Sequence, residues 1–133
     1  MRKFNELSAS KQNAMVYFLS IIFSLITYSL FFKLYQVIYQ PVNVGGDLYR
    51  MFPMWFEKLF VSFIFALYFY LAFFVFLFIK TNTVKVWLWG AAIPLIFALL
   101  GGGKDLLIAL VLSLSGWLLA QGLLFIKRRI KRN

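Results

Sequence analysis

The chain alternates between long apolar runs and short polar segments. The apolar runs cover residues of about 14–38, 55–79, 84–100 and 105–126. Spanning the hydrocarbon layer of a membrane takes about 20 apolar residues in a helix. The pattern therefore predicts an all-α integral membrane protein with four transmembrane helices, built as a single membrane domain over residues 1–133.

The segments between the runs carry turn chemistry. Gln40-Pro41 ends the first run, and the connection over 41–54 combines Gly45-Gly46-Asp47 with several aromatic residues. We expect this connection to be a loop lying in the outer membrane interface. The third and fourth runs are joined by Gly101-Gly102-Gly103-Lys104-Asp105, which predicts a tight hairpin between two helices.

Small residues recur along the fourth run at helical spacing. Ala109, Ser113, Gly116 and Ala120 are separated by steps of four, three and four residues, which places them on one face of a helix. On the third run Ala91, Pro94 and Ala98 share a face in the same way. Small faces allow two membrane helices to approach closely. We therefore expect these two faces to pack against each other across the glycine turn.

The first run carries a polar stripe, and the second run is rich in aromatic residues. The stripe consists of Asn13, Tyr17, Ser20, Ser24 and Thr27. It should face protein, either in hydrogen bonds between helices or along a path through an oligomer. Eight of the residues from 59 to 79 are Phe, so we expect the second helix to present the largest surface to lipid.

The distribution of charge predicts the orientation. The chain is 63% hydrophobic and only 14% charged, with 14 Lys plus Arg against 4 Asp plus Glu. With both termini in the cytoplasm, ten basic residues lie on the inner side and four on the outer side, as the positive-inside rule requires. The expected location is the cell inner membrane. The inner group includes the basic tail over 127–133, in which Lys127, Arg128, Arg129, Lys131 and Arg132 are expected to bind anionic lipid headgroups.

The inventory of reactive side chains argues against an enzyme. The chain has no Cys and no His, and no two of its four acidic residues are spaced for one helix face. Catalytic, metal and cofactor sites need such groups in clusters, so we expect none of these sites. No ionisable group lies at membrane depth, which also argues against a monomeric proton-coupled carrier.

These features favour a protein that works through contacts between helices. We expect a non-catalytic accessory or assembly subunit, or an immunity or exclusion-type partner of another membrane protein. The alternatives are a small oligomeric flippase or transporter for a lipid-linked substrate, and a holin-like pore. The expected partners are membrane lipids and either another membrane protein or a second copy of the chain, with no nucleic acid involved.

Overall fold

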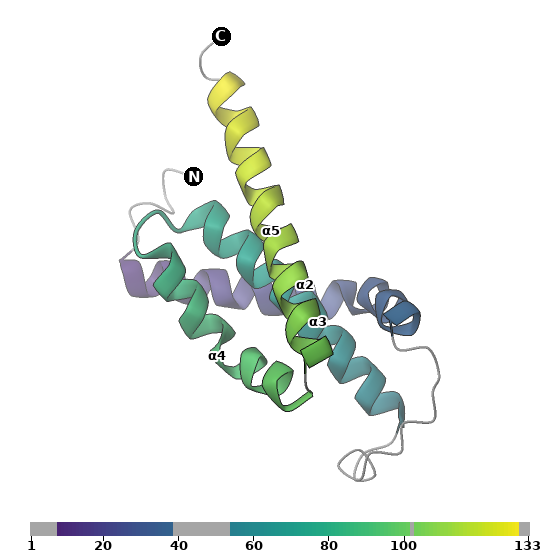
Figure 1. Ribbon diagram of the computed structural model, residues 1–133. Coiled ribbons are helices and arrows are strands. Elements are labelled where there is room, and N and C mark those ends of the chain that lie inside the picture. The colour runs from purple at the N-terminus through teal and green to yellow at the C-terminus, as the bar shows by residue number, and fades with distance from the viewer. Residues whose placement is uncertain (1–7, 39–53, 102, 131–133) are drawn as a thin grey trace.

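The structure is a computed structural model that describes residues 8–38, 54–101 and 103–130, and every regular element in these ranges is a helix. The helices are α2 (Ala9–Ile38), α3 (Met54–Phe78), α4 (Thr83–Gly101) and α5 (Gly103–Ile130) (Figure 1). The all-helical prediction is confirmed. Nearly all of the predicted interfacial loop, the middle glycine of the hairpin turn and the last two basic residues of the tail lie outside the described residues.

Three helices are long and apolar enough to cross a membrane. They are α2 over Ala9–Leu34, α3 over Lys58–Phe78, and α5 along its whole length. At 1.5 Å per residue the shortest of these segments, 21 residues in α3, is about 32 Å long and matches the hydrocarbon layer. In α4 the apolar part, Thr83–Ile96, is shorter. The structure thus indicates a membrane protein with three candidate spans, and a crossing by α4 stays a prediction.

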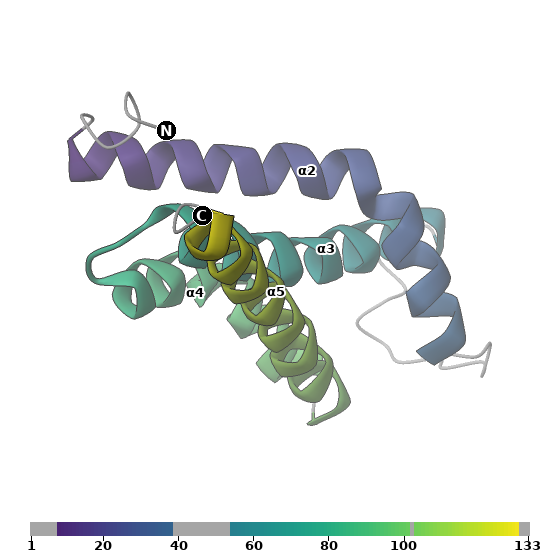
Figure 2. The same ribbon diagram turned by 90° about the horizontal axis from the view of Figure 1, so that it is seen from above.

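The central element is α3, because α2 and α5 both pack against it. Figures 1 and 2 show α3 between these two helices. In an apolar 18-residue stretch of α3, 50% of the residues are buried, against 22% in the corresponding stretches of α2 and α5. The expectation that this Phe-rich helix shows the largest surface to lipid is therefore wrong. Its bulky side chains fit because the neighbouring helices supply the small residues.

Two hydrophobic clusters divide the core along α3. The first joins Phe65 and Tyr68 near the middle of α3 to Phe31 of α2, Ala98 of α4 and Ala109 of α5. The second joins the later part of α3 to the beginnings of α2 and α4. Its buried members are Val16, Leu71, Phe74, Val75, Ile79, Val86 and Ala91. Because α4 contributes to both clusters, it is held along its length although it is the shortest helix.

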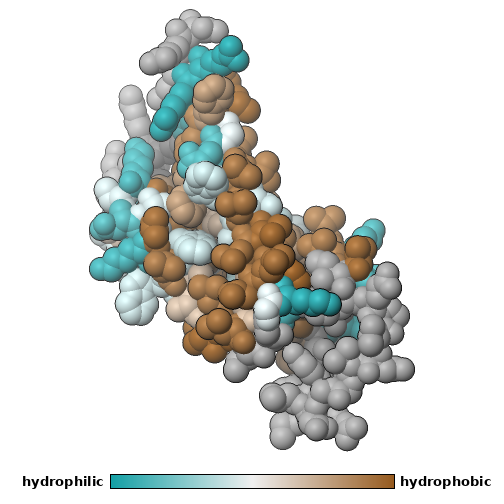
Figure 3. Space-filling model, viewed as in Figure 1, coloured by the Kyte–Doolittle hydropathy of each residue, from teal (hydrophilic) through white to brown (hydrophobic). Residues whose placement is uncertain are grey.

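The helices do not share one direction. In both views α5 lies at a steep angle to α2 (Figures 1 and 2), and in Figure 1 its C-terminal end projects beyond the other helices. Large apolar side chains cover much of the visible face over the first part of α5, whereas the projecting end is hydrophilic (Figure 3). The arrangement is thus a set of crossing helices around α3 rather than a bundle of near-parallel helices.

Candidate functional site

The polar stripe of α2 is largely used in packing against α3. Ser20 and Ser24 are completely buried. The Ser20 hydroxyl lies 2.8 Å from the carbonyl oxygen of Val16 and 3.4 Å from that of Tyr70, and the Ser24 hydroxyl donates to the Ser20 carbonyl at 2.7 Å. Because each hydroxyl finds an acceptor four residues back in its own helix, these serines can be buried without an unpaired polar group.

The other stripe residues lie at the margins of this interface. The Tyr17 hydroxyl donates to the carbonyl oxygen of Val86 at 2.8 Å and so joins α2 to α4. Thr27 donates to the Phe23 carbonyl at 2.7 Å, and Asn13 is partly buried. None of the five stripe residues lines either of the two hollows described below.

The small strip of α5 packs mainly on α3. Ala109, Gly116 and Ala120 are buried, and Ser113 is partly buried. A Cβ atom at Gly116 would lie 2.3 Å from the carbonyl oxygen of Phe69 and 3.2 Å from the amide nitrogen of Phe73. The backbones of α3 and α5 therefore touch at this point, as at other close crossings of membrane helices.

The small face of α4 meets three helices instead of matching the α5 strip along its length. Ala91, Pro94 and Ala98 are all buried. Ala98 shares a cluster with Ala109 of α5, whereas Ala91 belongs to the cluster around the start of α2. The Pro94 carbonyl accepts a hydrogen bond from the Tyr68 hydroxyl at 2.5 Å. The expected pairing of the two small faces is thus limited to the region near the glycine turn, because α3 occupies the rest of the strip.

Two further contact residues could be recognised only from the structure. A Cβ atom at Gly90 would lie 2.6 Å from the Tyr17 ring, so this glycine allows α2 and α4 to approach. Tyr68 bridges α3 to α4 from the middle of an apolar run. In the sequence, Gly90 has no other turn residues around it and Tyr68 lies in the middle of an apolar run. Neither feature shows which helix the residue contacts.

The two tryptophans at the start of α4 lie in different environments. Trp89 is 71% exposed, whereas Trp87 packs against the second core cluster. The indole N–H of Trp87 is buried, and it is the one buried side-chain polar atom without a hydrogen-bond partner in the part of the chain that the structure describes. The other buried side-chain nitrogen and oxygen atoms of the described residues have hydrogen-bond partners.

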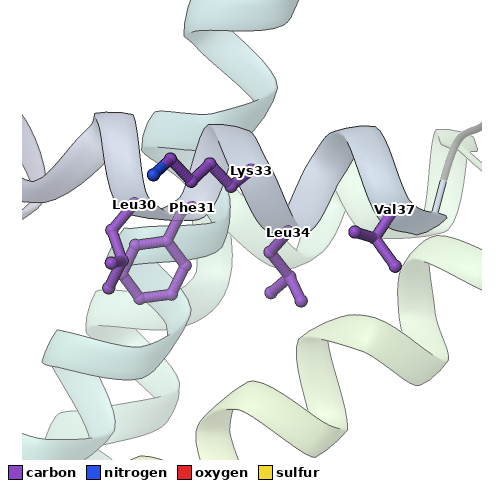
Figure 4. Close-up of a pocket in the computed structure, with 5 residues that line it drawn as sticks. All are labelled: Leu30, Phe31, Lys33, Leu34 and Val37. Carbon is purple, nitrogen blue, oxygen red and sulfur yellow. The ribbon is translucent and has the colours of Figure 1, made fainter.

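Two shallow hollows lie at opposite ends of α2. The first, of about 390 Å³, is lined by Leu30, Phe31, Lys33, Leu34 and Val37. Figure 4 shows its four apolar side chains on one side of the helix, with Lys33 extending along the helix above them. The second, of about 280 Å³, is lined by Gln12, Phe78, Lys80 and Thr81.

The C-terminal basic residues extend α5 instead of forming a separate tail. Lys127, Arg128 and Arg129 lie in the last turn of the helix and are exposed. Cations at this position complement the negative end of the helix dipole. Lys131 and Arg132 follow outside the described residues.

The described residues bring together a packed core, two hollows and a basic helix end. They contain no group of three or more His, Cys, Asp or Glu side chains that could hold a metal ion.

Comparison with protein-family models, curated proteins and solved structures finds no match for the chain.

Proposed function

We propose that the protein is a non-catalytic, multi-pass protein of the cell inner membrane that acts by binding another membrane protein. It would serve as an accessory or assembly subunit, or as an immunity or exclusion-type partner. The supporting observation is that the polar and small side chains of the helices are used inside the chain. Ser20 and Ser24 bond to backbone carbonyls, and Gly116 receives α3. The surface that is left for contact with a second molecule is the outer apolar surface.

The outer face of α4 is the best candidate for the contact with the partner. We define it as Trp89, Ile93, Ile96 and Leu99, whose exposed fractions are 71%, 70%, 55% and 66%. These residues repeat at helical spacing on the side away from the buried Ala91, Pro94 and Ala98. The helix continues through Pro94, which lacks an N–H and so removes one backbone hydrogen bond. A partner helix on this face would support an element that is short for a span.

The experiment is site-specific photo-crosslinking in the native membrane. A photoreactive amino acid at Ile93 or Ile96 should give one discrete adduct with a second protein, whereas an adduct with only a second copy of the 15.6 kDa chain would contradict the proposal. The matched control places the same group at the buried Ala98, where crosslinks should stay within the chain. The absence of an adduct at both exposed positions, with a lone stable species in mild detergent, would remove the proposal.

We further propose four spans with both termini in the cytoplasm. The support is the charge distribution, with ten basic residues inside and four outside. The basic end of α5 would then lie at the anionic inner leaflet, where each cation near the surface contributes about 1 kcal/mol. In this arrangement α4 crosses with a length of 19 residues, about 28 Å, which is close to the hydrocarbon thickness.

A further inference from the structure

The hollow at the N-terminal end of α2 has a lining suited to an anion. Its walls come from three separate segments: Gln12 from α2, Phe78 from the end of α3, and Lys80 with Thr81 from the α3–α4 connection. Figures 1 and 2 both show these segments at the same end of the molecule. The volume of about 280 Å³ is several times the share of one water molecule in the liquid, about 30 Å³. The hollow can therefore hold a group larger than a single water.

The charges around this hollow are positive. Lys80 and Thr81 are exposed, and exposed Lys11 and Lys85 lie in the adjoining first turns of α2 and α4. Among the side chains that the structure describes, the one carboxylate is Asp105, at the start of α5 and beyond the far end of α4. No described acid therefore neutralises Lys80. An ammonium with amide and hydroxyl neighbours is a set of hydrogen-bond donors that matches phosphate oxygens.

The position of the hollow favours the phosphate of a lipid headgroup over a free phosphate ion. It lies where the apolar segment of α3 ends, at Phe78, and polar residues begin. A membrane that contains this segment places its headgroups at that depth. Phe78 adds an apolar wall next to the donors, as the junction between a headgroup and an acyl chain requires.

We propose that the hollow lined by Gln12, Phe78, Lys80 and Thr81 binds the phosphate of one anionic phospholipid. The bound lipid would lie across α2, α3 and the start of α4. This site is separate from the basic end of α5, and it does not depend on the proposed protein partner.

The test is native mass spectrometry of the full chain in mild detergent with added phosphatidylglycerol. The starting protein carries Lys127→Gln, Arg128→Gln, Arg129→Gln, Lys131→Gln and Arg132→Gln, so that the basic tail does not dominate lipid binding. One equivalent of lipid should still bind. Lys80→Gln should weaken it about fivefold, as expected for one cation at a headgroup, and Thr81→Val should also weaken it. Lys80→Arg should retain binding.

The matched control is Lys104→Gln, which removes an exposed lysine at the far end of α4. Equal lipid affinity in the Lys80→Gln and Lys104→Gln proteins would overturn the proposal, as would equal binding of zwitterionic phosphatidylcholine. Full displacement of the lipid by millimolar inorganic phosphate would assign the hollow to a free anion and would also overturn it. Because Lys80 is exposed, the circular dichroism of the Lys80 variants should match that of the starting protein.

Discussion

At Gly116 the backbones of α5 and α3 are in contact because no Cβ atom stands between them. The obstructing atom for any larger residue is the Phe69 carbonyl oxygen, which belongs to a helix backbone and cannot rotate away. At Gly90 the obstructing atom belongs to the Tyr17 ring, which can move, but only by disturbing its hydrogen bond to Val86. Each close approach therefore depends on a single residue.

We expect Gly116→Ala to destabilise the protein by about 1–3 kcal/mol, the usual cost of overpacking a tight contact. Gly116→Leu should prevent folding or assembly. The matched control is Gly122→Ala, because nothing lies within 4 Å of a Cβ atom there; it should be neutral or slightly stabilising. The measurement is thermal unfolding in detergent, followed by size-exclusion chromatography. Equal melting temperatures for the two alanine variants would place Gly116 outside the helix contact.

The hydrogen bond from Tyr68 to Pro94 gives a second prediction at this scale. Tyr68→Phe removes the donor while keeping the ring, and interhelical hydrogen bonds in membranes contribute about 0.6 kcal/mol on average and up to about 1.7. We expect a loss of stability within this range. Tyr28→Phe serves as the control, because Tyr28 is 39% exposed on α2. A Tyr68→Phe protein as stable as the control would show that the bond contributes nothing.

At the scale of elements, α3 is held as the central helix by aromatic contacts with α2 and by small residues that lie between these contacts. Its Phe69, Tyr70 and Phe74 rings contact Phe23 and Phe31 of α2 with centroid distances of 5.1 to 6.2 Å. Aromatic pairs at such distances add about 0.5–1.5 kcal/mol beyond their buried area. Between these rings, Ser20 and Ser24 leave room for α3 to approach.

Substitutions of Ser24 can distinguish the effect of side-chain size on stability from the effect of hydrogen bonding. Ser24→Ala should be nearly neutral, because its hydroxyl bonds within its own helix. Ser24→Leu should overpack the α2–α3 interface and cost about 1–3 kcal/mol or more. The exposed Ser29→Leu is the control for added size on the same helix. Thermal unfolding of the three proteins checks this order, and an unchanged Ser24→Leu protein would contradict the observed packing.

The sequence was sufficient to predict the helices but not their partners. Hydrophobic run length located the four helices, and helical periodicity identified Ser20, Ser24, Gly116 and Ala109 as residues on narrow faces. Periodicity describes one helix at a time, so it could not show that Gly116 meets Phe69 of α3. The abundance of Phe in α3 led to the prediction of a lipid-facing helix. A protein core is as apolar as lipid, so the composition of α3 does not distinguish the two. A buried face is distinguished from a lipid-facing one by its fit to the surface of a neighbouring helix. The hydrophobic pattern of the sequence does not show which helices fit together.

At the scale of the whole molecule, the crossing of α2 and α5 is compatible with both helices spanning one bilayer. The 26-residue apolar segment of α2 is about 39 Å long, longer than the hydrocarbon layer of about 30 Å. A helix of this length can span the layer at a tilt of about 40°. The 28 residues of α5 have similar freedom. Two spans tilted in different directions then cross at a steep angle.

The topology can be tested with a phosphatase-type reporter that is active only outside the cytoplasm. We expect activity from a fusion at Val44 and none from a fusion at Asn82, because the α3–α4 connection carries basic residues. A fusion after Asn133 should also be inactive if α4 crosses the membrane. Activity after Asn133 with silence at Asn82 would reduce the spans to α2, α3 and α5, and activity at Asn82 would reverse the orientation.

The central place of α3 has a consequence for biosynthesis. One face of α3 can be covered by α2 as soon as both helices have left the ribosome, but the face that receives Gly116 must wait for α5, which follows α4 in the chain. The contact between α3 and α5 therefore forms only after residues 103–130 have been synthesised. A chain truncated after α4 should insert with the Gly116-facing side of α3 open to lipid, and we expect membrane quality-control proteases to degrade it faster than the protein that includes α5.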